Sequence, residues 1–251
     1  MRHRALMSIA AVLVGFVGLY IGVHIRKTDG SKGKINVKKN MAKRIDLTAE
    51  LSEQTTVFPG DPPFESQRIA SLEKSSYFNL FRLCLCNHMG THIDFPAHVI
   101  KNGKTSSDYS LSDLEGDGLI IEVPKGCKCV DKSFIKKERH KFFKNAIVFF
   151  KTSNSEIPKT GKIVEDYVYI DLEAAKELVD LKVKMVGIDY LSVDKYESEK
   201  LPVHNILLSN NILIIENLEL NNAEPGQWTL SAMPLKIPQM DGLPVRVSMT
   251  R

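Results

Sequence analysis

Three histidines and one aspartate lie within eleven residues, in the segment His-Met-Gly-Thr-His-Ile-Asp-Phe-Pro-Ala-His. They are His88, His92, Asp94 and His98. Imidazole and carboxylate groups are the ligands that catalytic divalent metals prefer. The glycine permits a tight backbone turn beside an ion, and the proline excludes a helix through the segment. We therefore expect this segment to bind metal rather than to form an ordinary polar surface loop.

A further candidate ligand, Glu216, lies downstream, in a region that also contains His204. Glu216 directly follows Ile212, Leu213, Ile214 and Ile215, a run expected to form a buried strand. A carboxylate at the end of a buried strand needs a partner, because an isolated buried charge is very costly. A metal would be one such partner. Taken singly, His204 also fits a helix cap and Glu216 a solvent-facing side chain.

The segment from His88 to His98 resembles the signature of the metal-dependent cyclase-like hydrolases, which include bacterial kynurenine formamidases and isatin hydrolases. The family pattern, His-x-Gly-Thr-His-x-Asp-x-Pro-x-His, is matched at every fixed position. The resemblance runs from about Ile45 to the C-terminus and includes the Ile-Glu-Asn-Leu context of Glu216 and the closing segment 233–246. It implies a single swivelling β/β/α-type domain.

The resemblance also implies two divalent metal ions, with zinc or manganese suited to these ligands. His88, His92 and Asp94 would hold the first ion. Asp94 would bridge to a second ion, which His204 and Glu216 would complete.

The resemblance gives His98 the role of general acid and base, and the ordinary pKa of histidine suits that role near neutral pH. The implied reaction is hydrolysis of a small-molecule amide, with N-formylkynurenine as the leading substrate and formate and an aryl amine as products. Isatin-like cyclic amides and lactones are the alternative, because the same ligands serve all these hydrolases. Phe58 precedes a Pro-Gly-Asp turn similar to one beside the family's active site. It is either a substrate-pocket residue or plain core.

A membrane-tethered metal- or ligand-binding module without turnover is a hypothesis of a different class. His98 favours an enzyme, since a pure binding protein needs no base outside its ligand set. The family resemblance further implies a homodimer or a larger homo-oligomer.

Strands and helices must position these residues, and in the sequence they mix without strict alternation. This order predicts an α+β or mixed α/β fold. A strand over Tyr77–Cys86, rich in aromatic and aliphatic residues, is predicted to be buried on both faces and to lead into the metal segment. Further strands are expected at 45–48, 118–123, 146–150, 184–188, 212–215 and 243–249. Helices are expected at 131–143, 171–181 and 204–208, with Asp131 and Asp171 as N-caps, and a loop at 101–113.

The N-terminal residues differ in character from the rest. Residues 5–25 form an apolar run without Asp, Glu, Lys or Arg, and 21 residues of helix reach roughly 30 Å, the thickness of a hydrocarbon core. We expect a membrane anchor or signal sequence over 1–28, a basic tether over 29–44 and the hydrolase domain over 45–251. The heavier positive charge after the run places the domain on the cytoplasmic side. If translation starts at Met41, the protein would instead be soluble and cytoplasmic.

The remaining composition is that of an ordinary globular protein, with 43% hydrophobic and 25% charged residues in a chain of 251. The net charge of +4 owes much to basic residues between 26 and 44, and no basic stripe interleaved with aromatics follows. Nucleic-acid binding is therefore not indicated. The four cysteines form the pairs Cys84/Cys86 and Cys127/Cys129. Cys84 and Cys86 precede His88 at the same interval, so they are either thiolate ligands or, as is more common for such cysteines, inert packing residues.

Overall fold

The structure, a computed structural model, describes residues 43–74 and 76–251. The predicted anchor at 5–25 and almost all of the tether lie outside these residues. Among the helices that the structure describes, none is long and apolar enough to cross a membrane.

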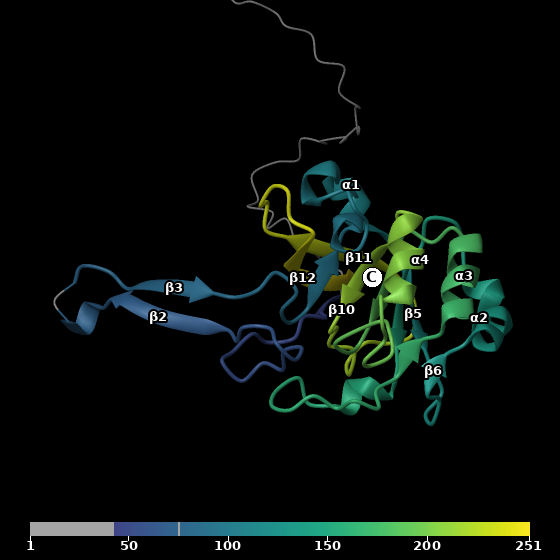
Figure 1. Cartoon of the computed structure of the whole chain (residues 1–251), viewed down its shortest axis with the longest axis horizontal. Coiled ribbons are helices and arrows are strands. Elements are labelled where there is room, and N and C mark those ends of the chain that lie inside the picture. Colours follow the sequence, from purple (N-terminus) through teal and green to yellow (C-terminus); the bar gives the residue numbers. More distant parts are fainter. Residues whose placement is uncertain (1–42, 75) are drawn as a thin grey trace, which may run out of the picture. The chain divides into compact units, whose positions relative to one another are not determined.

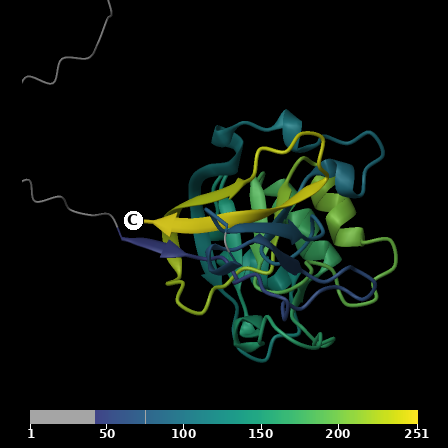
Figure 2. The same cartoon turned by 90° about the vertical axis from the view of Figure 1, so that its left-hand side faces the viewer.

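An eight-stranded sheet forms the body of the described part (Figure 1). Its strands, in spatial order, are β1 (Arg44–Asp46), β12 (Gly242–Thr250), β11 (Gly226–Pro234), β5 (Glu115–Glu122), β7 (Ile147–Lys151), β9 (Met185–Ile188), β10 (Leu213–Glu216) and β4 (His92–Asp94). The sheet closes on itself because β4 pairs with both β10 and β12. The neighbours from β5 to β10 are parallel, whereas the other pairs are antiparallel. Figure 2 shows β1 beside the end of β12, close to the C-terminus. The predicted mixed α/β fold is confirmed.

Three helices, α2 (Lys132–Glu138), α3 (Leu172–Asp180) and α4 (Pro202–Ser209), cover one side of the parallel strands (Figure 1). Asp131 accepts a hydrogen bond from the N–H of Phe134, and Asp171 accepts from the N–H of Glu173, so both predicted caps are confirmed. A two-stranded sheet of β6 (Cys129–Val130) and β8 (Tyr169–Ile170) lies at the N-terminal ends of α2 and α3. A short helix, α1 (Leu111–Leu114), precedes β5.

The parallel strands are buried on both faces, which explains their unbroken apolar runs. Along β7, Val148 and Phe150 pack against the helices, whereas Ile147 and Phe149 fill the interior of the closed sheet. Alternate residues of a strand point to opposite faces, so each run supplies two separate cores.

The predicted buried strand at Tyr77–Cys86 is wrong in its burial and its length. The strand is β3 (Leu80–Cys84), and all five of its residues are exposed. Among the described strands it pairs with β2 (Glu65–Ala70) alone, in a hairpin that extends away from the body (Figure 1). Because the hairpin stands off the sheet, neither of its faces is covered by the described residues, although its composition resembles that of a core strand.

Two of the longer strands, β2 and β11, lie outside the predicted elements. β2 is polar and has no apolar period, whereas β11 has buried residues at Trp228, Leu230 and Ala232, a period of two that is typical of a strand and that the sequence analysis did not use. The helix predicted at 131–143 ends at Glu138 and continues as a 3₁₀ turn at Arg139–Lys141. The loop predicted at 101–113 contains a 3₁₀ turn and the start of α1.

We expect Gly118→Ala to destabilise the sheet. A Cβ at Gly118 would lie 2.4 Å from the carbonyl oxygen of Ile147, which is backbone and cannot move aside. We expect the free energy of unfolding to fall by about 1–3 kcal/mol, as measured by urea unfolding. Gly116→Ala on the same strand is the matched control, since its Cβ meets only the flexible end of Lys184. An equal loss in both variants would contradict this account.

Candidate metal centre

The pairing of β4 with β10 brings three of the predicted ligands to one face. His92 lies opposite Glu216 in this antiparallel ladder, and Asp94 lies two residues further along β4. Residues opposite each other, and residues two apart, share a face of a sheet. Ile93 and Ile215 therefore point the other way, into the interior core. The local fold thus projects His92, Asp94 and Glu216 together toward the side that α4 covers.

His204 comes to this face from α4, which begins at Pro202. Its Nε2 lies 3.5 Å from Asp94 Oδ2 and 3.2 Å from Glu216 Oε1. His88 lies at the other oxygen of Asp94, with its Nδ1 2.8 Å from Oδ1. The Nε2 of His92 lies 3.3 Å from the same oxygen. The structure therefore brings all five predicted ligands together.

Asp94 belongs to two groups of side chains whose ligand atoms all lie within 4.8 Å of one another. One group contains His88, His92 and Asp94, and the other contains Asp94, His204 and Glu216. The oxygen Oδ1 faces the first group and Oδ2 faces the second. No cysteine belongs to any such group among the described residues, and Cys84 is exposed.

The chemistry of this cluster fits a divalent metal. Asp94 is fully buried, and its Oδ2 accepts no hydrogen bond from any described residue. Burial alone would lower the pKa of His204, but the carboxylates of Glu216, Asp194 and Asp94 outweigh it and raise that pKa well above 6.5. The buried carboxylates thus favour positive charge in this cluster, which a cation would supply.

Each candidate histidine ligand has an outer acceptor for its second ring nitrogen. His92 Nδ1 lies 2.9 Å from the carbonyl oxygen of Gly90, and His204 Nδ1 lies 2.6 Å from Asp194 Oδ2. His88 Nε2 lies 3.0 Å from Asp241 Oδ2. Such acceptors fix the orientation and tautomer of metal-binding histidines.

The sequence analysis missed Asp194 and Asp241 as functional residues. Asp194 lies in the loop after β9, where sites are commonly built, and Asp241 lies in an Asp-Gly pair directly before β12. These positions are signals, but they do not tell which histidine each aspartate meets.

His98 ends a 3₁₀ turn, Pro96–His98, that follows β4. Its ring lies against the ring of His88, with centroids 4.0 Å apart, and its Nδ1 is 3.3 Å from Asp241 Oδ2. Burial lowers the pKa of His98, which favours the neutral imidazole that a base requires. His98 lies outside the two groups that share Asp94, although His88, His98 and Asp241 form a third, more exposed group.

Phe58 lies at the surface, 37% exposed, and its ring centroid is 6.1 Å from that of Tyr196. The described contacts do not join it to the metal residues, so its place in a substrate pocket stays a prediction.

Comparison with known proteins gives consistent matches. A family model described as "Putative cyclase" matches residues 45–195. The kynurenine formamidase of Salinibacter ruber is 34% identical over 203 residues, which cover 80% of this chain and 94% of that protein. A predicted metal-dependent hydrolase from Bacillus stearothermophilus is 28% identical, with a TM-score of 0.72, over 83% of this chain and 98% of the other. An isatin hydrolase bound to the product analogue thioisatinate shares the fold, with a TM-score of 0.72 at 19% identity, over 84% and 92% of the two chains.

We expect Asp194→Ala to destabilise the metal-free protein. Asp194 is buried and accepts hydrogen bonds from the backbone N–H groups of Val203 and His204, as well as facing His204 Nδ1. Its removal leaves these buried donors without a partner. We therefore expect the free energy of unfolding, measured with urea, to fall by about 3 kcal/mol. Asp171→Ala, which removes a more exposed cap, should cost only about 1 kcal/mol. A loss for Asp194→Ala no larger than that of its control would refute the assignment.

Proposed function

The chain belongs to the cyclase family, and from this we propose that it is a metal-dependent hydrolase that cleaves an aryl formamide, with N-formylkynurenine as its substrate. The observation that carries the proposal is the shared carboxylate of Asp94, which faces both groups of histidine and carboxylate ligands, with His98 at their side. The likeness to a kynurenine formamidase over 94% of that protein's length supports the choice of substrate.

We propose that two divalent ions, zinc or manganese, bind here. His88, His92 and Asp94 would hold the first, and Asp94, His204 and Glu216 the second. Bound ions would polarise the formyl carbonyl and lower the pKa of a water molecule toward 7.

The chain's own residues then supply proton transfer and orientation. His98 accepts a proton as water attacks the formyl carbon, and it donates that proton to the departing nitrogen as the carbon–nitrogen bond breaks. Water and the formamide thereby give formate and an aryl amine. No covalent intermediate with the protein is required. Phe58 is proposed to lie along the substrate path beside Tyr196.

An isatin-like cyclic amide or a lactone is the second candidate substrate, favoured by the shared fold of an isatin hydrolase. The hypothesis of a binding module without turnover is disfavoured by His98, whose position beside the ligands such a module would not need. Membrane anchoring through residues 5–25, with the domain on the cytoplasmic side, stays a prediction.

We expect His98→Ala to lower the kcat for N-formylkynurenine by about 10²–10⁴-fold, because proton transfer is lost. The full chain, supplied with zinc or manganese, is assayed by formation of kynurenine, and bound metal is counted by elemental analysis. The variant should keep two ions per chain. His140→Ala, an exposed histidine on the surface, is the matched control and should behave as wild type.

Three results would count against the proposal. Loss of metal from His98→Ala would make His98 a ligand. Fewer than two ions on the wild-type chain would remove the second site. Failure of the loaded wild type to hydrolyse N-formylkynurenine, with turnover of isatin, would transfer the function to the second candidate.

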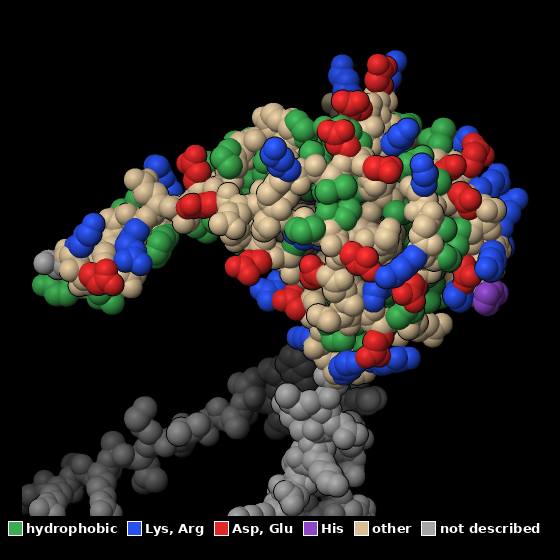
Figure 3. Space-filling view, turned by 90° about the horizontal axis from the view of Figure 1, so that it is seen from below, with side chains coloured by type: hydrophobic (Ala, Val, Ile, Leu, Met, Phe, Trp, Pro, Cys, Tyr) green, Lys and Arg blue, Asp and Glu red, His purple; other side chains and the backbone are tan. Residues whose placement is uncertain are grey.

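We also propose that two copies of the chain associate through the hairpin of β2 and β3, here called the arm. Eight large apolar side chains between residues 69 and 85 are more than a third exposed: Ile69, Leu72, Tyr77, Phe78, Leu80, Phe81, Leu83 and Leu85. Figure 3 shows hydrophobic side chains gathered at the far end of the arm. A two-stranded hairpin of this kind is marginally stable alone in water, so it needs a surface to pack on.

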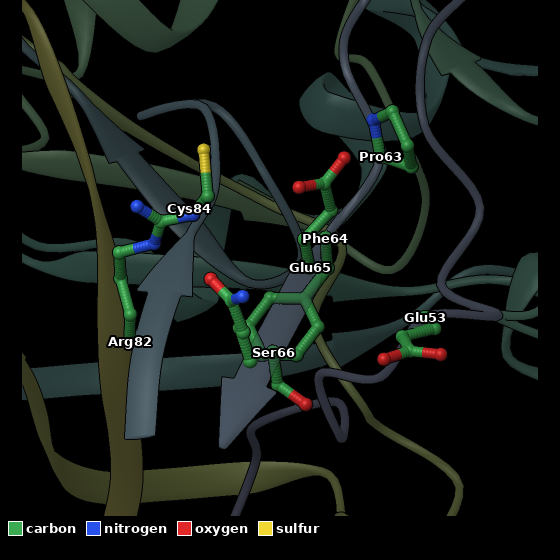
Figure 4. A pocket seen from close by; sticks show the side chains of 8 residues that line it. Glu53, Pro63, Phe64, Glu65, Ser66, Arg82 and Cys84 are labelled. Carbon is green, nitrogen blue, oxygen red and sulfur yellow. The ribbon is translucent and has the colours of Figure 1, made fainter. Parts of the chain in front are cut away.

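The two faces of the arm differ. Gln67 pairs with Arg82 and Glu65 with Cys84, and with Glu53 these residues line a polar hollow (Figure 4). On the other face, Leu83 and Leu85 continue into an apolar groove of about 920 Å³ that includes Leu235 and Ile237 of the body.

The arm and the groove therefore make one surface that a second copy can match, as a twofold interface requires. At roughly 100 Å² for each side chain, the apolar residues on the groove's side, Phe81, Leu83, Leu85, Leu235 and Ile237, would bury on the order of 500 Å² per copy. Two copies would then bury about the 1,000 Å² that a specific interface needs.

We expect Leu83→Asp to convert a dimer to a monomer, because a charge in the centre of an apolar interface is costly. Gln67→Asp places the same charge on the polar face and should leave the dimer intact. Sedimentation velocity of the full chain at matched concentrations measures both. A monomeric wild type, or dissociation by both variants alike, would rule out this interface.

A further inference from the structure

Asp241 lies where the chain just before β12 contacts the chain just after β4. It immediately precedes β12, and its backbone carbonyl accepts the N–H of Phe95, which follows β4. Its neighbour Met240 exchanges hydrogen bonds with Ser106, so the loop is held on both sides. The carboxylate of Asp241 is therefore placed by backbone contacts and does not depend on a flexible tip.

Gly242 shows how closely this loop fits His88. A Cβ at Gly242 would lie 2.3 Å from Cε1 of His88, so the ring rests directly on the glycine backbone. Gly242 also pairs with Asp94 in the ladder of β12 and β4. The position of the His88 ring and that of the Asp241 carboxylate are thus fixed by the same stretch of chain.

The two oxygens of Asp241 have different partners. Oδ1 accepts a hydrogen bond of 2.7 Å from Nδ2 of Asn87. Oδ2 faces both Nε2 of His88, at 3.0 Å, and Nδ1 of His98, at 3.3 Å. A carboxylate oxygen has two lone pairs and can accept from both rings at once.

This geometry selects one tautomer for each ring. If Nε2–H of His88 donates to Asp241, the lone pair of its Nδ1 is left facing Asp94 and the metal group. If Nδ1–H of His98 donates to the same oxygen, Nε2 is the nitrogen left to take up a proton. One carboxylate oxygen thereby sets the tautomer of both the proposed ligand His88 and the proposed base His98.

We propose that Asp241 is a positioning residue that sets the tautomer and orientation of both His88 and His98 through one oxygen, with Asn87 fixing which oxygen that is. The proposal rests on the hydrolase function and the role of His98 proposed above. It assigns to Asp241 no contact with substrate.

The test uses an amide in place of the carboxylate. With Asn87 oriented as in the structure, where its Nδ2 donates to this side chain, the amide oxygen of Asp241→Asn accepts from Asn87 and the NH₂ group turns toward His88 and His98. Both rings must then accept there and carry their proton on the other nitrogen, where His88 would have to bind metal and His98 would have to act as base. We expect kcat to fall by about 10²-fold or more and metal affinity by about 10–100-fold.

A second variant separates tautomer control from simple loss of charge. In Asn87→Ala/Asp241→Asn the amide is free to turn its oxygen toward the two rings. We expect this double variant to recover at least tenfold in kcat over the single variant, and to regain metal affinity. Asp46→Asn, an exposed carboxylate paired with Arg246, is the control and should match wild type.

Two readouts need no substrate. Metal affinity is measured by chelator competition, and nitrogen NMR of labelled histidines in the metal-loaded full chain reports which ring nitrogen carries the proton. The wild type should show His88 protonated at Nε2 and His98 at Nδ1, and Asp241→Asn should show the reverse for His98. These results stand even if N-formylkynurenine is not the substrate, so the two proposals fail separately.

Unchanged tautomers in Asp241→Asn would overturn the inference. A double variant no better than the single one would also overturn it, since Asp241 would then act through its charge or its packing. A third ion bound by the wild type and absent from Asp241→Asn would make Asp241 a ligand instead.

Discussion

The burial of Asp94 is the constraint on which the rest of the site depends. A carboxylate removed from water costs several kcal/mol unless charges or hydrogen bonds replace its solvation. Asp94 is fully buried, and the described groups around its oxygens are mainly imidazoles, from His88, His92 and His204. Those imidazoles are in turn held by acceptors of their own. The site is therefore built outward from one buried charge, and each surrounding group serves to make that charge tolerable.

The closed sheet provides the rigidity that this arrangement needs. β4 has only three residues, yet it is held from both sides, by β10 and by β12. A slip of one residue in either ladder would turn Ile93 toward the metal residues and Asp94 into the apolar interior, which is prohibitively unfavourable. The packing of Ile93 and Ile215 in the interior core thus fixes the register that places His92, Asp94 and Glu216 together. Within β4, the burial of Ile93 on one face thus fixes where His92 and Asp94 lie on the other face.

The parts of this architecture that could be predicted from the sequence are those encoded locally. The spacing from His88 to His98 lies within one segment, and the buried strands carry long apolar runs. The convergence of His204 and Glu216 on the segment from His88 to His98 came from family resemblance, because no local pattern relates residues more than a hundred positions apart. Asp241 was missed for the same reason, since its contact with His88 spans 153 positions and exists only once distant segments meet. Asp194 lies only ten positions before His204, but no local pattern in that loop indicates the contact.

The arm shows a second limit, because its sequence predicted burial that the described part of the chain does not provide. Apolar composition indicates that a strand will be covered, but it does not indicate by what. In β3 the expected cover is absent from the described part of the chain, so the residues that looked like core form an exposed face.

The three candidate histidine ligands differ in their outer acceptors, and this difference distinguishes a buried side of the site from a more exposed one. His92 faces a backbone carbonyl and His204 faces a buried aspartate, so both are enclosed by the fold. His88 alone faces Asp241, a partly exposed carboxylate that also reaches His98. The more exposed side of the cluster is therefore the side on which the proposed ligand His88 and the proposed base His98 share a single carboxylate oxygen. The acceptors of His92 and His204 are buried, so they serve to hold the fold, whereas the acceptor shared by His88 and His98 stays open to solvent.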